Sequence, residues 1–241
     1  MKEKIFITGA SRGIGRAIAL QLARPNRQLL LHYNQNHDLA QQVALACQEK
    51  KAETKLLQAD FAKDEDMKRI LEEIPSVDIL INNAGVSSYG QIQDISLEEW
   101  KRIFQINVHS PFQITQKLIP YMIRNKYGRI VNISSIWGQV GSSCESLYSA
   151  TKGAILSFTK SLAKELAPSG ITVNCLCPGI VDTDMMKIFR EEEKEELKKE
   201  VPIGRFLQAE EVAYWVEYLV SKQASAFTGQ VISPNGGQII F

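Results

Sequence analysis

The sequence predicts an α/β fold built on one parallel sheet, and three observations lead to this prediction. Strand-like and helix-like segments alternate along all 241 residues. The strand-like segments are nearly continuous in apolar residues, which is typical of strands covered by helices on both faces. No linker, low-complexity tract or repeat divides the chain. We therefore expect a single domain over residues 1–241, with a Rossmann-like, doubly wound sheet of about seven parallel strands.

The expected strands are the apolar runs that turn residues bound. They lie at residues 4–8, 28–33, 54–59, 77–82, 128–134, 171–176 and 230–234. Between them, apolar residues recur at helical spacing, which predicts helices over residues 13–23, 38–50, 64–73, 97–124, 147–166 and 209–219. In open sheets of this kind, ligands bind outside the carboxyl ends of the strands. The loops that follow the strands are therefore where we expect site residues.

Composition excludes several classes of protein. The net charge of +1 provides no electrostatic footprint for nucleic acid or an anionic membrane. No apolar run approaches the roughly 18 residues of a membrane span, and the N-terminus lacks a signal-peptide pattern, so we expect a cytoplasmic protein. The cysteines lack the paired spacing of metal ligands, and we expect structural thiols and no metal site; they are Cys47, Cys144, Cys175 and Cys177.

The first predicted strand ends in the loop "TGASRGIG", residues 8–15. Gly9, Gly13 and Gly15 would let the backbone approach a pyrophosphate, and the helix that follows would offer its N-terminal N–H groups. A glycine-rich loop alone is weak evidence, because tight turns also need glycine. No Lys-Ser/Thr pair follows, so the loop favours a dinucleotide over a nucleoside triphosphate.

The end of the second strand indicates which dinucleotide is bound. Folds that prefer NAD place an acidic residue there for the ribose 2′-hydroxyl, and the segment "LHYNQN" has none. Asn34 can donate to a phosphate, and Arg12 can bring a positive charge to the same corner. These two residues predict NADP(H); the alternative is that Arg12 is a solvent-exposed loop residue.

Two tyrosine–lysine pairs share a four-residue spacing. They are Tyr148–Lys152 in "YSATK" and Tyr218–Lys222 in "YLVSK". Only the first pair follows a serine at a strand end, Ser135, which lies thirteen residues earlier. We predict that the first pair is catalytic and assign the second to helix packing and solvent.

Together these motifs resemble the short-chain dehydrogenase/reductase family over nearly the whole chain. "TGASRGIG" matches the family's cofactor loop, Asp60 its adenine contact, "NNAG" (residues 82–85) its ribose segment and "PG" (residues 178–179) its nicotinamide-side turn. Phe61 departs from the pattern, because a smaller aliphatic residue is usual there. The resemblance implies four catalytic residues, Asn107, Ser135, Tyr148 and Lys152. It implies that the cofactor contacts Gly9, Ser11, Arg12, Gly13, Ile14, Gly15, Asn34, Asp60, Phe61, Asn83, Ala84, Gly85, Tyr148, Lys152, Pro178, Gly179, Val181 and Thr183.

The residue types fit the reduction of a carbonyl. Hydride transfer leaves negative charge on oxygen, which needs a hydrogen bond and then a proton. Ser135 can supply the bond and Tyr148 the proton, while Lys152, one helical turn on, is expected to favour the phenolate. In the family this lysine also holds the nicotinamide ribose, and Asn107 anchors a water on the proton path. Each residue alone has a structural alternative, such as a turn cap or a satisfied core hydroxyl.

Within the family, the chain most resembles bacterial 3-oxoacyl-[acyl-carrier-protein] reductases, through "GRIVNISSIWG", "YSATKGAILSFTKSLAKELAPSGITVN" and "TGQVISPNGGQ". This implies NADPH-dependent reduction of a 3-oxoacyl thioester in fatty acid synthesis. It also implies a homotetramer formed through helices 97–124 and 147–166, with acyl carrier protein as a partner. Lys126 and Arg129 keep positive charge at one docking position, whereas Ser169 removes it from the other.

The stretch "SSIWGQVGSSCESLYSATKGA" also resembles a subgroup that reduces a ketone-bearing lysine modification on elongation factor P. Glu145 within it would repel an acidic partner or attract a substrate amine. Residues 185–206 are the expected substrate lid. An alternative of another class is a non-catalytic NADPH-binding sensor, against which the intact set of Ser135, Tyr148 and Lys152 argues.

Overall fold

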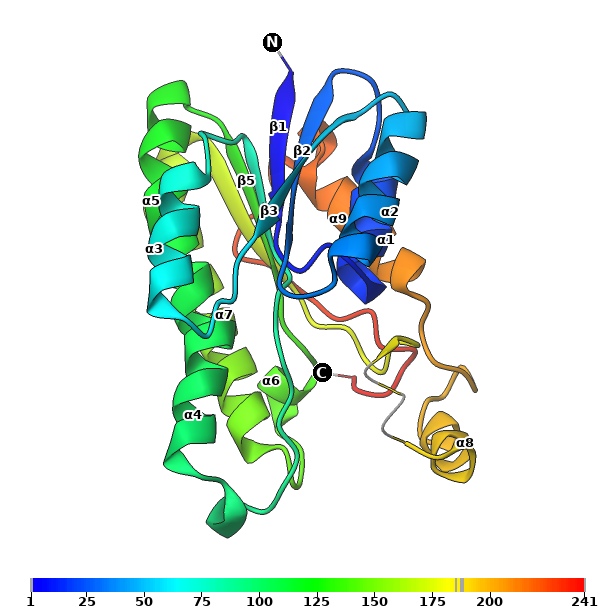
Figure 1. The fold of residues 1–241 in the computed structure, drawn as a ribbon. Coiled ribbons are helices and arrows are strands. Elements are labelled where there is room, and N and C mark those ends of the chain that lie inside the picture. Colours follow the sequence, from blue (N-terminus) through cyan, green and yellow to red (C-terminus); the bar gives the residue numbers. More distant parts are fainter. Residues whose placement is uncertain (1, 185, 187–188, 241) are drawn as a thin grey trace.

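The computed structural model describes residues 2–184, 186 and 189–240 and contains one seven-stranded parallel sheet (Figure 1). The strand order is β3-β2-β1-β4-β5-β6-β7, so the chain reverses direction across the sheet between β1 and β4. The strands are β1 (Glu3–Ile7), β2 (Arg27–Tyr33), β3 (Glu53–Gln58), β4 (Ile79–Asn82), β5 (Gly128–Ile133), β6 (Ile171–Leu176) and β7 (Val231–Ile232). The predicted fold class is confirmed, although β7 is shorter than the segment 230–234.

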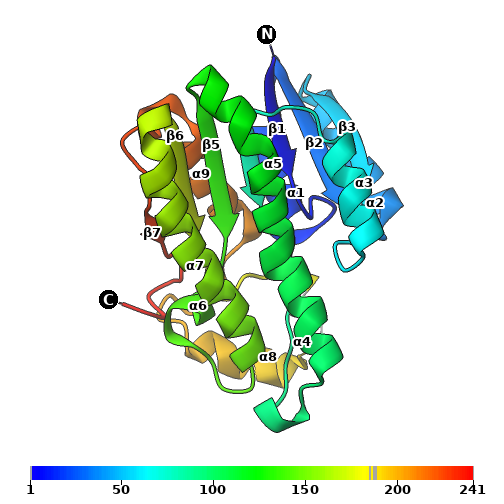
Figure 2. The same ribbon diagram turned by 90° about the vertical axis from the view of Figure 1, so that its left-hand side faces the viewer.

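Helices cover both faces of the sheet (Figures 1 and 2). Alternate residues of each strand point to opposite faces: Ile5 and Ile7 join the core under one layer, whereas Phe6 joins the core under the other. The first layer contains α1 (Gly13–Leu22), α2 (His37–Glu49) and α9 (Ala209–Val220). The second contains α3 (Asp64–Glu73), α5 (Ser110–Asn125) and α7 (Ser146–Leu166). Double-sided burial explains why the central strands are largely apolar, whereas the edge strand β3 is partly exposed and carries polar residues.

The predicted helix 97–124 is divided in the structure. It begins as α4 (Leu97–Phe104), widens into a π-helical turn over Gln105–His109 and continues as α5. Pro111 provides the physical reason, because it has no N–H to donate to the carbonyl of Asn107 four residues earlier. Ser110 instead donates its hydroxyl to the carbonyl of Ile106, at 2.6 Å. π-helical turns often mark functional positions, and this one carries a predicted catalytic asparagine.

Short elements gather beyond the carboxyl ends of the strands, at the lower end of the sheet in Figures 1 and 2. They include α6 (Trp137–Val140) and α8 (Glu191–Lys199). The mixed charge run forms the exposed helix α8, where lysines pair with glutamates three residues earlier. The predicted lid spans 185–206, and its residues 185, 187 and 188 lie outside the described residues.

Short 3₁₀ turns connect longer elements. They include η1 (Ile92–Asp94) before α4, η3 (Ala167–Ser169) between α7 and β6, and η5 (Lys222–Ala224) after α9.

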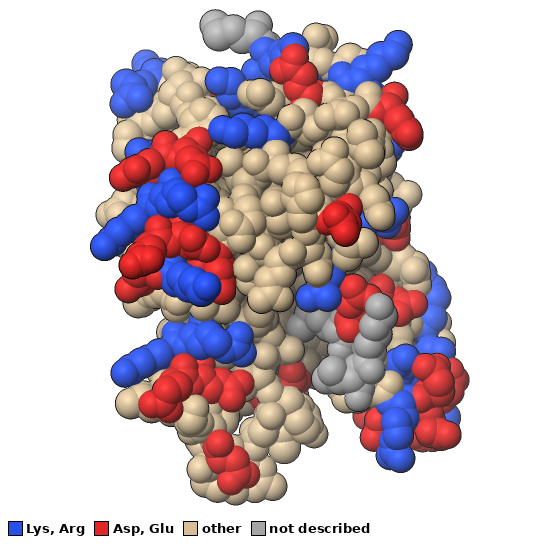
Figure 3. Space-filling model, in the orientation of Figure 1, with Lys and Arg blue, Asp and Glu red and all other residues tan. Residues whose placement is uncertain are grey.

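Charges of both signs are interspersed over the face shown in Figure 3, around a broad uncharged centre. This distribution agrees with the net charge of +1. No helix in the described part of the chain is both long enough and apolar enough to cross a membrane.

Candidate active site

A cavity of about 300 Å³ opens at the carboxyl ends of the strands, beside the point where the strand order reverses. Most of the predicted cofactor residues line it, namely Gly9, Ser11, Arg12, Gly13, Ile14, Gly15, Asn34, Asp60, Phe61, Asn83, Ala84, Gly85, Tyr148, Lys152 and Thr183. The predicted residues Asn107, Ser135, Pro178, Gly179 and Val181 are absent from this lining. Sequence reasoning missed other lining residues, including His32, Val86, Ile106, Ser134 and Asp184.

The glycine loop is held against the segment that follows β4. A Cβ on Gly9 would lie 3.0 Å from the Cα of Ala84, and Gly9 has a φ of +65° that disfavours other residues. A Cβ on Gly15 would lie 2.1 Å from the carbonyl oxygen of Gly9. The amide of Asn83 donates to the carbonyls of Thr8 and Gly9, at 2.9 and 3.1 Å. The glycines therefore allow three segments to meet at van der Waals distance.

The start of α1 is suited to an anion. Its first turn contains no acidic residue, and its N-cap residue, Arg12, makes no side-chain cap. Because residues 13–15 at the start of α1 line the cavity, the positive end of the helix dipole faces it. Arg12 forms an ion pair with Asp184, at 3.5 Å, and Asn34 lines the same cavity. Arg12 and Asn34, the two residues predicted to bind a 2′-phosphate, thus line the same cavity. The guanidinium of Arg12 is paired there with the carboxylate of Asp184.

Tyr148 and Lys152 lie in α7, and the Nζ of Lys152 is 5.5 Å from the centre of the Tyr148 ring. Lys152 is 6% exposed and donates to the carbonyl of Ile133 at 2.9 Å, at the end of β5. Ser134, also at this strand end, donates its hydroxyl to the carbonyl of Lys152. Ser135 is buried, accepts the N–H of Trp137 at 3.2 Å and hydrogen-bonds to Tyr148. The end of β5 thus fixes the position of α7.

Burial dominates the electrostatics of the phenol. Burial raises the pKa of Tyr148 above its usual value, the charge of Glu145 raises it further, and the hydrogen bond with Ser135 lowers it. Burial also lowers the pKa of the Lys152 ammonium to about 8. The expectation that Lys152 favours the phenolate stays a prediction, because burial dominates the pKa of the phenol in this structure. Tyr148 is therefore held protonated, as a proton donor must be.

Asn107 approaches the same point from the π-helical turn. Its amide donates to the carbonyl of Val86 at 2.9 Å and to the hydroxyl of Thr151 at 3.1 Å, and its Oδ1 accepts the N–H of Val86. A Cβ on Gly85 would lie 3.4 Å from both the Oδ1 of Asn107 and the Nζ of Lys152. The two side chains therefore converge on one glycine. The side-chain amide of Asn107 is therefore committed to contacts within the protein.

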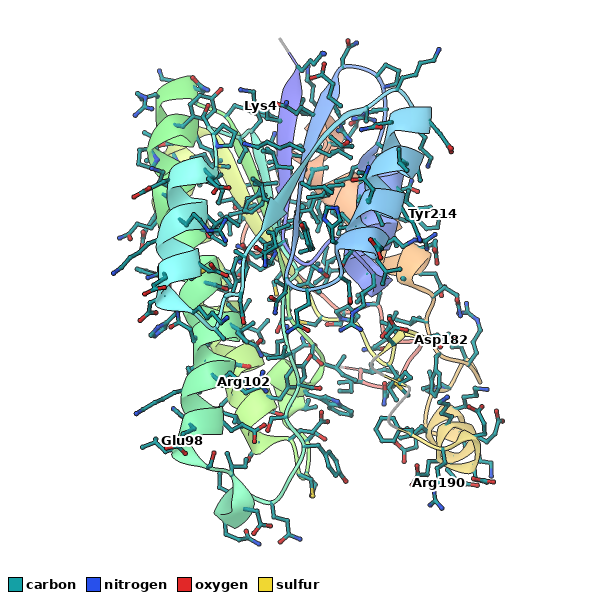
Figure 4. All side chains as sticks on the ribbon, viewed as in Figure 1. Lys4, Glu98, Arg102, Asp182, Arg190 and Tyr214 are labelled. Atoms are coloured by element: carbon teal, nitrogen blue, oxygen red, sulfur yellow. The ribbon has the colours of Figure 1, made fainter. Side chains whose placement is uncertain are left out.

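The predicted nicotinamide-side turn lies behind the cavity wall. Pro178 accepts the N–H of Ile136, and Gly179 donates to the carbonyl of Pro234. A Cβ on Gly179 would lie 3.0 Å from the Cα of Asn235, so this turn packs tightly on the C-terminal segment. Val181 forms an isolated bridge with Leu207. Asp182 follows on the side of α8, the helix that starts after Arg190 (Figure 4).

Glu145 lies at the N-terminus of α7, one turn before Tyr148. Burial raises the pKa of its carboxyl, and a hydrogen bond with the side chain of Ser142 lowers it. No lysine or arginine among the described residues forms an ion pair with Glu145. Within the described part of the chain, a partly buried carboxylate without a paired cation therefore stands beside the phenol of Tyr148.

The expected basic docking position is only half present. Arg129 is 5% exposed, and its guanidinium donates to the carbonyls of Gly128 and Gly170. The expectation that Arg129 offers charge to a partner is wrong, because this side chain supports the turn between α7 and β6. Lys126 remains exposed.

One family profile and several known proteins match most of this chain. The profile of the family described as short chain dehydrogenase matches residues 3–194. The uncharacterized oxidoreductase YmfI of Bacillus subtilis is 45% identical over 239 residues, covering 98% of this chain and 99% of that protein. The 3-oxoacyl-[acyl-carrier-protein] reductase FabG of Aquifex aeolicus is 39% identical over 237 residues, covering 96% and 95%. The FabG of Staphylococcus epidermidis is 36% identical over 241 residues, covering 98% and 99%.

A solved structure shares the whole fold. The crystal structure of a variant actinorhodin polyketide ketoreductase with NADPH superposes with a TM-score of 0.90, at 31% identity. The match covers 98% of this chain and 97% of the other. The likeness therefore includes every element that positions the cavity.

Proposed function

This chain belongs to the short-chain dehydrogenase family and is an oxidoreductase by descent, and on that premise we propose that it is an NADPH-dependent carbonyl reductase. Its proposed substrate is a 3-oxoacyl thioester on acyl carrier protein, which it reduces to the 3-hydroxyacyl form. The convergence of Asn107 and Lys152 on Gly85, beside a protonated Tyr148, carries this proposal. A protein that only binds the cofactor has no need of such an arrangement.

The residues around the cavity fit NADPH. The N-terminus of α1 would take the pyrophosphate, while Arg12 and Asn34 would take the 2′-phosphate, in place of the acidic residue that an NAD site uses. Asp60 and Phe61 would hold the adenine. The segment Asn83–Gly85 would hold the adenine ribose, and the turn from Pro178 to Thr183 the nicotinamide side.

The proposed chemistry assigns one task to each side chain. NADPH supplies the hydride when it is bound. Ser135 donates a hydrogen bond to the substrate carbonyl oxygen, where negative charge develops. Tyr148 gives that oxygen its proton, which completes the alcohol. Lys152 stabilises the phenolate that remains, and the backbone carbonyl of Asn107 positions a water that returns a proton.

Two observations favour a second substrate, a ketone-bearing lysine modification on elongation factor P. Arg129 is buried and Ser169 is uncharged, so neither position offers a positive charge to an acidic carrier protein. Glu145 presents a carboxylate beside the phenol, which would attract an amine on the substrate and repel an acidic partner. Both substrates require the same reduction of a ketone.

A homotetramer is part of the proposal. Exposed apolar side chains lie on two separate surfaces, where a partner subunit would cover them. The first surface, on α4 and α5, contains Leu97, Trp100, Phe112 and Ile123. The second, on and beside α9, contains Tyr214, Trp215, Tyr218 and Phe227.

The test compares the initial rate of NADPH oxidation with acetoacetyl-carrier protein, acetoacetyl-CoA and a protein bearing an amino-ketone modification of lysine. We expect turnover with the carrier-protein thioester to exceed that with the CoA thioester. We also expect NADPH to exceed NADH as donor by at least about tenfold, the effect of one charge-assisted hydrogen bond. A higher rate with the amino-ketone protein would favour the second substrate. Binding of NADPH without turnover of any ketone would favour the sensor.

A further inference from the structure

His32 is a buried polar residue of the cavity wall to which the proposed chemistry gives no task. It lies near the end of β2, is 3% exposed and lines the cavity between the glycine loop and the end of β3. Buried imidazoles need hydrogen-bond partners on both nitrogens. Those partners in this protein belong to the two segments on either side of the proposed cofactor.

On one side, His32 binds two consecutive N–H groups of the glycine loop. Its Nδ1 accepts from the N–H of Gly9 at 3.0 Å, and its backbone carbonyl accepts from the N–H of Ala10 at 2.8 Å. Gly9 has a left-handed φ of +65°, so the chain leaves the direction of β1 at this residue. His32 therefore fixes the direction in which the loop leaves the strand toward α1.

On the other side, His32 reaches the end of β3. Its Nε2 lies 3.0 Å from the carbonyl oxygen of Ala59. A backbone N–H can only donate and a carbonyl can only accept, so these partners require a bare Nδ1 and a protonated Nε2. Burial lowers the pKa of His32 to about 4, against smaller opposing effects from the Ala59 carbonyl and the charge of Asp60. The ring is therefore neutral at physiological pH, in the one tautomer that serves both segments.

Phe61 holds the plane of the imidazole. The two rings are parallel, with their centres 3.9 Å apart, and Phe61 is 4% exposed. This phenylalanine stands where a smaller aliphatic residue is usual in the family, and only a flat side chain can stack in this way. The departure from the motif and the buried histidine are thus one structural unit.

We propose that His32 is a positioning residue for the cofactor, whose ring sets the separation between the glycine loop and the Asp60–Phe61 turn. The inference rests on the proposed function, in which the loop takes the pyrophosphate and the turn takes the adenine. The histidine itself contacts the backbone of Gly9 and Ala59. It acts by keeping the two binding segments at the spacing of one dinucleotide.

Three substitutions in the full-length protein separate the two contacts. His32→Asn keeps an acceptor near the position of Nδ1, His32→Gln keeps a donor near the position of Nε2, and His32→Leu removes both. The dissociation constant for NADPH is measured by the fluorescence of the bound dinucleotide, without any ketone. KM for NADPH and kcat are then measured with acetoacetyl-CoA, and thermal midpoints record folding. His109→Asn, at an exposed histidine that bonds Gln105, is the matched control.

We expect His32→Asn, His32→Gln and His32→Leu each to raise the dissociation constant and KM for NADPH about tenfold, since each leaves at least one buried group unpaired, at a cost on the order of one decade. We expect the control to stay within about threefold of the wild type, with kcat at saturating NADPH unchanged throughout. A folded Asn or Gln variant with wild-type affinity would overturn the inference, as would a folded Leu variant with wild-type affinity. Failure of the wild type to bind either NADPH or NADH would instead overturn the proposed function and this inference together.

Discussion

The two tyrosine–lysine pairs of this chain have identical spacing and different surroundings. Tyr148 and Lys152 lie within α7, and Lys152 is buried against the carbonyl of Ile133. Tyr218 lies near the end of α9, which stops at Val220 because Ser221 is extended, with φ −75° and ψ 163°. Lys222 begins the separate turn η5. Four-residue spacing places two side chains on one face only where the helix continues through both.

The surroundings also differ in chemistry. Ser135, from the end of β5, hydrogen-bonds to Tyr148, whose hydroxyl is thereby tied to a strand end. The ring of Tyr218 instead packs edge-on against Phe227, at 5.5 Å, and against Trp215, and the residue is 38% exposed. The comparison shows that the same four-residue spacing leaves two tyrosines in different surroundings, and that the neighbouring strand end makes the difference.

The strongest test of this comparison removes one hydroxyl from each pair. Tyr148→Phe should lower kcat for reduction at least about a hundredfold, the low end for loss of a general acid. Tyr218→Phe should leave kcat within about twofold, because its ring contacts remain. Initial rates of NADPH oxidation with the substrate that the wild type turns over best measure both. Comparable losses in the two variants would show that the first pair has no special role.

The sequence predicts the parts of the site that depend on local pattern. Gly9 and Gly15 are recognisable because a strand, a turn and a helix start need them at that spacing, and the structure places their neighbours within contact distance. The strands are recognisable because double-sided burial leaves an apolar run. Most predicted cofactor residues line one cavity for the same reason, since every loop at that sheet edge follows a strand.

The parts that sequence reasoning missed depend on neighbours from distant segments. The pKa of Tyr148 rises because the fold buries its phenol beside Glu145, and no pattern measures that desolvation. The sequence alone suggests that Arg129 is a surface charge. In the structure its guanidinium is buried, because it donates to the carbonyl of Gly170. The partners of His32, Gly9 and Ala59, lie 23 and 27 residues away along the chain, so no local pattern indicates them. The π-helical turn is the exception, because Pro111 was visible in the sequence as a residue without an N–H.

A second test removes the cation of each pair. Lys152 has a pKa lowered to about 8 by burial, so it loses its charge as pH rises through 8, and kcat/KM for NADPH should fall above that pH. Lys152→Met should lower kcat/KM at pH 7 by about tenfold or more, as expected for a lost charge-assisted contact, and should abolish that decline. Lys222→Met should keep both the rate and the profile. A decline above pH 8 that survives in Lys152→Met would assign it to another group.

The smallest expected effect concerns the residue one turn before each tyrosine. This residue is Glu145 in the first pair and Trp215 in the second, so the position one turn earlier carries a carboxylate for Tyr148 and an indole for Tyr218. The charge of Glu145 raises the pKa of Tyr148. Glu145→Gln should therefore lower the pKa of the phenol and shift the ionisation of Tyr148, followed as tyrosinate absorbance with Tyr148→Phe as the reference, toward lower pH. The rate with acetoacetyl-CoA at pH 7 should change by less than about tenfold, because a partly solvated charge contributes on the order of 1 kcal/mol.

The same substitution separates tuning of the acid from recognition of the substrate. If Glu145 also holds an amine, Glu145→Gln should raise KM for an amino-ketone protein and leave KM for acetoacetyl-CoA unchanged, because only the first substrate carries the cation. Glu145→Asp keeps the charge on a shorter side chain and is the matched control for the pH profile. An ionisation of Tyr148 that stays in place in Glu145→Gln would show that Glu145 does not contribute to the raised pKa of its phenol. In that case the two pairs would differ only through the end of β5.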